Sequence, residues 1–158
     1  MKGELTGGCA CGAVRYKCSD KPIVELICHC RDCQHASGST SSAVLLVAGD
    51  RVTFEGAEQQ FHTVTTAAGN RLSRGFCPTC GSPVSGRWEG NAPVYSMLRA
   101  LHAGSLDDPS TFSPTVEDWI SRAYPWHTFH PDTLKFEEKP TPESVRDRIR
   151  AYFAARHD

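Results

Sequence analysis

Three cysteines lie within six residues of one another in the stretch ICHCRDCQHASG, which spans residues 27–38. Cys28, Cys30 and Cys33 could supply three sulfur ligands to a zinc ion, which binds its ligands in a tetrahedron. A catalytic or ligand-binding zinc site keeps one position free of protein, whereas a structural site is closed by four side chains. The stretch therefore predicts a catalytic zinc site with an open position.

Two other interpretations of this triad stay open. His35, two residues after Cys33, could supply the fourth ligand and close the site into a structural one. The three thiols could also bind no metal. His29 is a weaker candidate for the fourth ligand, because side chains alternate along extended backbone and His29 would point away from the flanking cysteines.

The charge of the predicted site indicates which chemistry it favours. Zinc bound by three thiolates carries a net negative charge, so it activates carbonyl groups and water poorly. It can still take a fourth sulfur and hold it as thiolate, because coordination removes the proton of a thiol. We therefore expect a small-molecule thiol as substrate rather than a hydrolysis reaction.

A second group of cysteines has the spacing of a structural zinc site. Cys77 and Cys80 form a Cys-x-x-Cys-Gly knuckle in FCPTCGSP, in which Gly81 permits a tight return of the chain. Cys9 and Cys11 in GGCACGAV supply two more thiols. The four together predict a closed all-cysteine site, so we expect two zinc ions per chain. The alternative is a redox dithiol or ordinary buried cysteines.

The composition favours a single globular domain in the cytosol. The chain has 158 residues, 39% of them hydrophobic and 22% charged, with a formal net charge of −1. The sequence lacks the basic stripe that a nucleic-acid-binding domain usually carries, so we expect no nucleic-acid partner. The start has no apolar segment of a secretory signal, and no apolar run approaches a membrane span. In a reducing compartment, eight cysteines indicate metal binding or catalysis. Cys18 has no partner spacing and is expected to be a small buried side chain.

Most of the chain reads as short strands. Segments rich in β-branched and aromatic residues occur at 13–18, 24–28, 42–47, 51–54, 60–65 and 94–98. Nothing in the first 100 residues holds a long helical period, and 104–115 is expected to be a loop. Near the C-terminus, Thr141 can cap a helix and Pro142 suits its first position. Val145, Ile149, Tyr152 and Phe153 would then form one apolar face, packed on the domain or on the partner of a homodimer.

Four motifs together resemble the glutathione-dependent formaldehyde-activating enzyme family, which also includes centromere protein V. The motifs are GGCACGAVRY, CHCRDCQHASGS, RGFCPTCGSPV and, further on, GSLDDP with YPW, and the resemblance covers about residues 5–130. It implies a mainly β fold, a β-tent of antiparallel sheets around the four-cysteine zinc site. We expect a domain over residues 1–135, followed by a C-terminal extension over 136–158 that contains the helix.

The resemblance also implies roles for the cysteines and an activity. Cys9, Cys11, Cys77 and Cys80 match the family's structural zinc ligands, and Cys28, Cys30 and Cys33 match its catalytic zinc ligands. The named activity joins glutathione to formaldehyde as S-hydroxymethylglutathione, formally a carbon–sulfur lyase reaction in reverse. Many relatives carry a histidine in a P-x-x-H-I-W stretch, where this chain has Glu117 and retains Trp119. The substrate could differ accordingly.

Several other side chains are candidates for contact with a thiol substrate. Arg31 and Arg74 could pair with substrate carboxylates, Ser37 could donate to an anion, and Trp119 could line a pocket. His127 and His130 are weaker candidates for acid–base groups. The main alternative to an enzyme is a non-catalytic zinc module that binds a thiol ligand or a macromolecular partner, since a fold does not by itself imply a chemistry.

Overall fold

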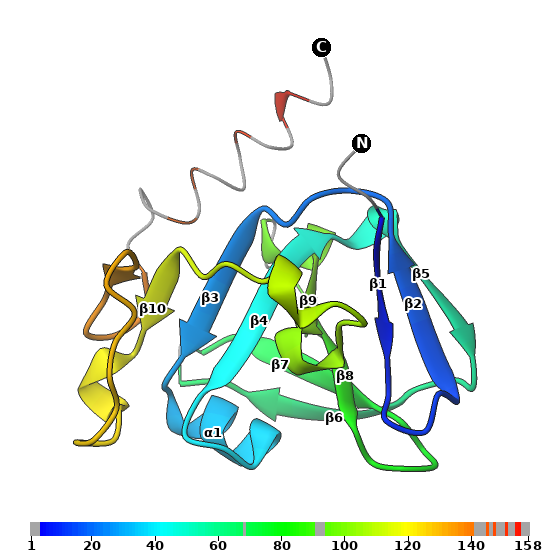
Figure 1. Ribbon diagram of the computed structural model, residues 1–158, viewed down its shortest axis with the longest axis horizontal. Coiled ribbons are helices and arrows are strands. Elements are labelled where there is room, and N and C mark those ends of the chain that lie inside the picture. The colour runs from blue at the N-terminus through cyan, green and yellow to red at the C-terminus, as the bar shows by residue number, and fades with distance from the viewer. Residues whose placement is uncertain are drawn as a thin grey trace.

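Two β-sheets dominate the computed structural model, which describes residues 4–67, 69–90 and 94–140 together with Val145, Asp147, Ala151, Ala154 and Ala155. In these residues the strands form a three-stranded sheet in the order β1-β2-β5 and an eight-stranded sheet in the order β11-β10-β3-β4-β9-β8-β7-β6. Strands β3 and β4 slope along one side of the molecule and β1, β2 and β5 along the other, with β6, β7 and β8 crossing below them (Figure 1).

The strands are β1 (Leu5–Gly8), β2 (Val14–Cys18), β3 (Val24–Cys28), β4 (Ser42–Ala48), β5 (Val52–Gly56), β6 (Gln60–Thr65), β7 (Arg71–Phe76), β8 (Pro83–Glu89), β9 (Leu98–His102), β10 (Val116–Asp118) and β11 (Leu134–Lys135). Helix α1 (Arg31–Ser37) connects β3 to β4. Short 3-10 helices lie at Gly49–Arg51, Tyr95–Met97, Ala103–Ser105, Pro109–Thr111 and Ile120–Arg122.

Strand β4 separates two hydrophobic cores. Because successive side chains point to opposite faces of a strand, Leu45 and Val47 pack into one core and Val44 and Leu46 into the other. The first core contains Cys9, Cys18 and Cys77, and the second contains Cys28 and Cys30. The two cysteine groups predicted from the sequence therefore lie on opposite sides of one strand.

The expectation of a mainly β fold is confirmed, and the strand predicted at 24–28 has those bounds. The strand predicted at 94–98 is wrong, since Tyr95–Met97 is a 3-10 helix and β9 begins at Leu98. Helix α1 was not expected, because seven residues are too few to establish a helical period. Gly38, at φ 63°, ends it in the left-handed conformation that glycine adopts without strain.

Two parallel pairings complete the larger sheet. Strand β10 lies between β3 and β11 and runs parallel to both, whereas the other strand pairs are antiparallel. Its register places Glu117 beside Ile27 and Asp118 beside Cys28. This pairing brings two acidic residues to the triad stretch from about ninety residues further along the chain.

The expected C-terminal helix lies mostly outside the described residues. Val145 is described, and it is 4% exposed within the second core. The backbone also continues to pack on the domain after β11, since Ile120 N–H donates to the carbonyl of Phe136. Among the described residues, no helix has the length and hydrophobicity needed to cross a membrane.

Gly7 in β1 occupies a position where any side chain would collide with its neighbours. A Cβ built there lies 2.3 Å from the Ser105 carbonyl oxygen and 2.3 Å from the Tyr16 hydroxyl. We expect Gly7→Ala to lower the free energy of unfolding by about 1–3 kcal/mol, because overpacking forces the surrounding groups apart. Thermal denaturation measures this loss. Gly104→Ala is the control, since a Cβ there meets nothing within 4 Å. Equal melting temperatures for the two variants would contradict the prediction.

Candidate metal centres and the triad pocket

Four sulfurs meet where the turn after β1 approaches the turn between β7 and β8. The Sγ atoms of Cys9, Cys11, Cys77 and Cys80 all lie within 4.8 Å of one another. The Cys9–Cys11 and Cys11–Cys77 sulfur distances are 3.5 and 3.8 Å. A zinc–sulfur bond of about 2.3 Å gives a tetrahedral sulfur–sulfur edge of about 3.8 Å. The donor set and its dimensions therefore fit a four-sulfur metal site.

The backbone around this four-cysteine cluster is arranged to stabilise thiolates. The Cys9 sulfur accepts the Val14 N–H at 3.2 Å, and the Cys77 sulfur accepts the Thr79 N–H at 3.4 Å. Hydrogen bonds from the Ser82 hydroxyl and amide lower the pKa of the Cys80 thiol to about 5. Hydrogen bonds to sulfur favour its charged form, which is the form that binds metal.

The three sulfurs of the triad meet at the junction of β3 and α1. The Sγ atoms of Cys28, Cys30 and Cys33 lie within 4.8 Å of one another. Cys30 caps the N-terminus of α1, and its sulfur accepts the Cys33 N–H at 3.3 Å. Hydrogen bonds from Cys28 and Cys33 lower the pKa of Cys30 to about 3, while the contact with Cys30 raises the pKa of Cys28. Cys30 is thus the first of the three to become a thiolate.

Neither neighbouring histidine joins these three sulfurs. His35 is exposed, and its Nε2 lies 2.9 Å from an Arg31 guanidinium nitrogen. His29 is fully buried and points instead to Glu117, with its Nε2 3.0 Å from the carboxylate. Closure of the site by His35 therefore has no support in this geometry. Among the described residues, the three sulfurs are the cysteine and histidine donors that gather at this site.

The triad opens into a small cavity of about 180 Å³ with a mostly apolar lining. Its wall includes Leu26, Val44, Leu46, Leu72, Trp88 and Trp119, together with Lys139, Pro140 and Val145 from the end of the chain. An apolar wall lowers the local dielectric constant and so strengthens the electrostatic interactions between the groups inside. The cavity is large enough for the reacting end of a small molecule.

Trp119 lines this cavity with an unusual backbone conformation. Its φ of 56° is in the left-handed region, and it is the one non-glycine residue with positive φ in the described part of the chain. The conformation is held by its N–H, which donates to the Glu138 carbonyl at 2.9 Å, and by its carbonyl, which accepts the Arg122 N–H. Strained backbone of this kind concentrates at functional sites.

The two arginines predicted to contact substrate lie at different distances from the triad cavity. Arg74 lines the triad cavity and also an adjoining cavity of about 390 Å³, which contains His35, His62 and His102. Arg31 is not among the residues lining either cavity. It lies exposed along α1 and bonds to Gln34 and His35. Arg74 is therefore placed to contact a molecule at the triad, and Arg31 is not.

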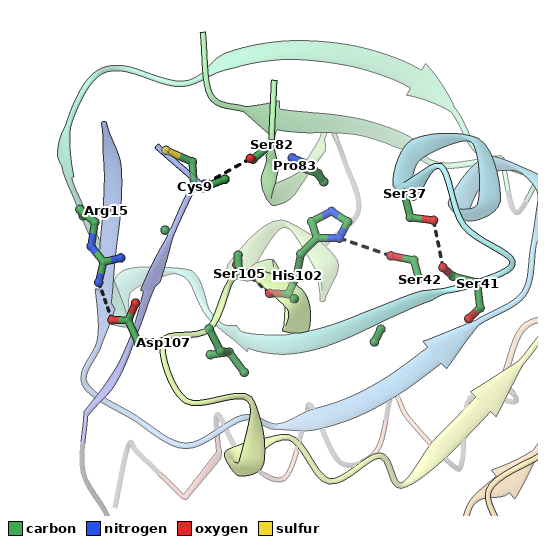
Figure 2. A pocket seen from close by; sticks show the side chains of 15 residues that line it. Cys9, Arg15, Ser37, Ser41, Ser42, Ser82, Pro83, His102, Ser105 and Asp107 are labelled. Carbon is green, nitrogen blue, oxygen red and sulfur yellow. Dashed lines mark hydrogen bonds and ion pairs between the residues drawn. The ribbon is translucent and has the colours of Figure 1, made fainter. Parts of the chain in front are cut away.

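Ser37 lines a different, polar cavity of about 540 Å³ (Figure 2). Serine hydroxyls and His102 surround this cavity, and the His102 ring faces Ser42 with its Nδ1 3.4 Å from the hydroxyl. Burial lowers the pKa of His102 to about 4, and Arg15 is paired with Asp107. The cavity thus offers hydroxyl groups, while His102 and the Arg15–Asp107 pair add no unbalanced charge to it. The Ser37 hydroxyl donates to the Gln34 and Ser41 carbonyls.

Glu117 forms a buried hydrogen-bond hub that the sequence did not reveal. One carboxylate oxygen accepts from the Nε2 groups of His29 and His127, at 3.0 and 3.2 Å. The other accepts from the His130 amide and the Thr133 hydroxyl, at 2.7 and 2.8 Å. His29, Glu117 and His127 have the composition of a metal-binding group. These hydrogen bonds already account for their arrangement, because they use both carboxylate oxygens.

Asp118 is a second acidic group missed at the sequence level. It lines the triad cavity, is 8% exposed, and its Oδ1 has no hydrogen-bond partner among the described residues. Burial raises the pKa of its carboxyl to about 7. The signal that places Glu117 and Asp118 here is the parallel pairing of β10 with β3, which local sequence patterns do not encode.

Comparison with known proteins adds a family and a fold. A family model described as "Glutathione-dependent formaldehyde-activating enzyme" matches residues 4–122. Among solved structures, a crystal structure of a Rhodobacter sphaeroides protein is similar, with a TM-score of 0.50 and 15% sequence identity over 65% of this chain and 87% of that chain. At that identity the structural likeness concerns the fold alone.

Replacement of Glu117 by glutamine should destabilise the protein. Burial opposes ionisation of the Glu117 carboxyl, but its four hydrogen bonds outweigh burial and hold its pKa below the ordinary 4.5. A carboxylate of this kind stabilises the fold above its unfolded pKa and loses that effect as pH falls through its folded pKa. We expect Glu117→Gln to cost about 3 kcal/mol at pH 7, and the difference from wild type to shrink below pH 4.5.

Chemical denaturation across pH measures this effect. Glu55→Gln is the matched control, because Glu55 pairs with Lys17 at the surface, where both side chains are about half exposed. Loss of such a pair changes stability by less than about 1 kcal/mol. A Glu117→Gln variant as stable as Glu55→Gln at neutral pH would contradict the role assigned to the hub.

Proposed function

The chain belongs to the glutathione-dependent formaldehyde-activating enzyme family, and on that premise we propose that it is a zinc-dependent carbon–sulfur lyase-type enzyme. Its substrates would be adducts between glutathione, or a related thiol, and an aldehyde, as in S-(hydroxymethyl)glutathione synthesis. The observation that carries this proposal is the group of three sulfurs within 4.8 Å, open to a mostly apolar cavity.

The residues present fit two zinc ions with different roles. Cys9, Cys11, Cys77 and Cys80 supply a complete set of four sulfurs, which is typical of a structural ion. The triad supplies three sulfurs from Cys28, Cys30 and Cys33 and leaves the fourth position to another donor. Zinc bound there would hold the sulfur of an incoming thiol as its nucleophilic thiolate.

The cavity supports a reaction between a thiol and a small aldehyde. In the synthetic direction the thiol sulfur forms a bond to the carbonyl carbon, and the carbonyl oxygen takes a proton; the reverse breaks the carbon–sulfur bond, with no oxidation or reduction. Trp88 and Trp119 line the space beside the sulfurs and supply large apolar surfaces there. A volume of about 180 Å³ suits the thiol end and a small carbonyl compound rather than a whole tripeptide.

Arg74 supports a thiol that carries a carboxylate. Its side chain is half-buried, lines both the triad cavity and the adjoining one, and makes no ion pair within the described part of the chain. A guanidinium group binds a carboxylate through two parallel hydrogen bonds. The peptide part of glutathione would extend past Arg74 into the adjoining cavity, where His35, His62 and His102 lie.

The zinc content of cysteine variants should separate the two sites. We expect two zinc ions in the purified wild-type protein and one in either Cys77→Ser or Cys30→Ser. Cys77→Ser should melt well below wild type, because binding of a structural metal supplies folding free energy. Cys30→Ser should keep its fold and lose binding of glutathione by titration calorimetry. It should also lose acceleration of formaldehyde–glutathione exchange, which NMR exchange spectroscopy measures.

Cys18→Ala is the control for loss of a buried thiol outside both clusters, and it should keep both metals and thiol binding. Thiol binding by Cys30→Ser equal to that of wild type would refute the proposed site. Unfolding of Cys30→Ser to the same degree as Cys77→Ser would make the triad structural.

Arg74→Gln should weaken binding of glutathione about tenfold, the loss expected for one charge-assisted contact. It should leave binding of 2-mercaptoethanol unchanged, because that thiol carries no carboxylate. Arg31→Gln is the matched control, since Arg31 lies exposed on α1 outside the cavity. Calorimetry with both thiols provides the measurement. Equal losses for the two thiols, or for the two variants, would contradict the role of Arg74.

A further inference from the structure

A segment beyond the family match forms part of the wall of the triad cavity. The family model matches residues 4–122, but Lys139 lines this cavity as well. The backbone just before Lys139 is held in place, since the Trp119 N–H donates to the Glu138 carbonyl at 2.9 Å. The two amides that follow Trp119 donate to the two carbonyls that precede that of Glu138. Lys139 is therefore fixed in the chain close to Trp119, which lines the same cavity.

Two cationic side chains line the triad cavity, and neither is balanced by a carboxylate of the protein. Arg74 is half-buried and Lys139 is exposed. Asp32 and Asp118 also line the cavity, but no ion pair involves any of these four side chains within the described part of the chain. The Asp32 carboxylate accepts the Ala67 N–H instead. Both cations are therefore available to a substrate that carries negative charge.

The two cations are placed to contact different parts of a thiol–aldehyde adduct. Arg74 lines both the triad cavity and the adjoining one, along the direction assigned above to the peptide part of the thiol. Lys139 lines the triad cavity and not the adjoining one. The part of the adduct that stays in the triad cavity is the sulfur together with the carbon that comes from the aldehyde. An anion at Lys139 would therefore belong to the aldehyde, and formaldehyde has none to offer.

We propose that Lys139 is a substrate-binding residue for a carboxylate on the aldehyde, so that the preferred carbonyl substrate is a small aldehyde acid such as glyoxylate. The inference rests on the proposed function, because it concerns the second substrate of the same reaction. The thiol sulfur forms a bond to the aldehyde carbon, and the carbonyl oxygen takes the thiol proton. The product keeps the carboxylate, and nothing is oxidised or reduced. A two-carbon aldehyde fits beside the thiol end in about 180 Å³.

The choice between two aldehydes tests this assignment. The zinc-loaded protein is given glutathione with either glyoxylate or formaldehyde, and NMR exchange spectroscopy measures the exchange rates over a range of aldehyde concentrations. We expect wild type to act on glyoxylate with the higher kcat/KM. Lys139→Gln should raise the KM for glyoxylate about threefold, as for one ion pair at an exposed lysine. Lys139→Glu should raise it further, because it places one carboxylate against another. Neither variant should change the reaction of formaldehyde.

Lys21→Gln is the matched control for loss of an exposed lysine. Lys21 is exposed and is not among the residues that line the triad cavity, so its variant should match wild type with both aldehydes. Titration calorimetry with glutathione alone gives a readout that does not depend on turnover. Glutathione affinity should be the same in wild type, Lys139→Gln and Lys139→Glu, because Lys139 is assigned to the aldehyde.

A KM for glyoxylate in Lys139→Glu equal to that of wild type would overturn the assignment. A wild-type protein that acts on formaldehyde and not on glyoxylate would overturn it too. Equal losses for the two aldehydes, or weaker glutathione binding, would place Lys139 at the thiol and have the same consequence. Absence of glutathione binding by wild type is a separate outcome, which would refute the proposed function and the assignment that rests on it.

Discussion

Three thiol groups lie around one point on one side of β4, and the rest of the fold must hold them there against their mutual repulsion as thiolates. Close thiols share protons, so one of them ionises early and the others resist ionisation. A metal ion would resolve this competition by binding all three as thiolates. The fold brings them together with a strand end, a helix N-terminus and the first turn of that helix, which supply Cys28, Cys30 and Cys33.

Under the proposed function, the two sides of β4 would separate a stabilising metal site from a reactive one. On one side, the four-cysteine cluster joins the turn after β1 to the β7–β8 turn, and Cys9 and Cys77 belong to the first core. On the other side, the second core surrounds the triad with apolar side chains and two tryptophans. A change at the first site should act through folding, and a change at the second through binding.

The sequence was sufficient for features that depend on local patterns. Cys-x-x-Cys with a following glycine identified the knuckle, and the composition of residues 24–28 identified β3. The alternation of side chains around His29 agreed with its position away from the sulfurs. The sequence was insufficient for α1, which is too short for a helical period, and for Glu117 and Asp118. Those two acids lie beside the strand that carries Cys28 through pairing between segments ninety residues apart, and nothing in either segment specifies its partner.

Zinc K-edge X-ray absorption counts the sulfur donors around zinc. Applied to the zinc-loaded protein, it would show whether the triad metal has only three sulfur ligands before a thiol binds. A closed four-sulfur site and a three-sulfur site in one chain average about 3.5 sulfurs per zinc, and glutathione should raise the average to about 4. An average of about 4 before any thiol is added, or no increase after it, would contradict a triad site that receives the substrate sulfur.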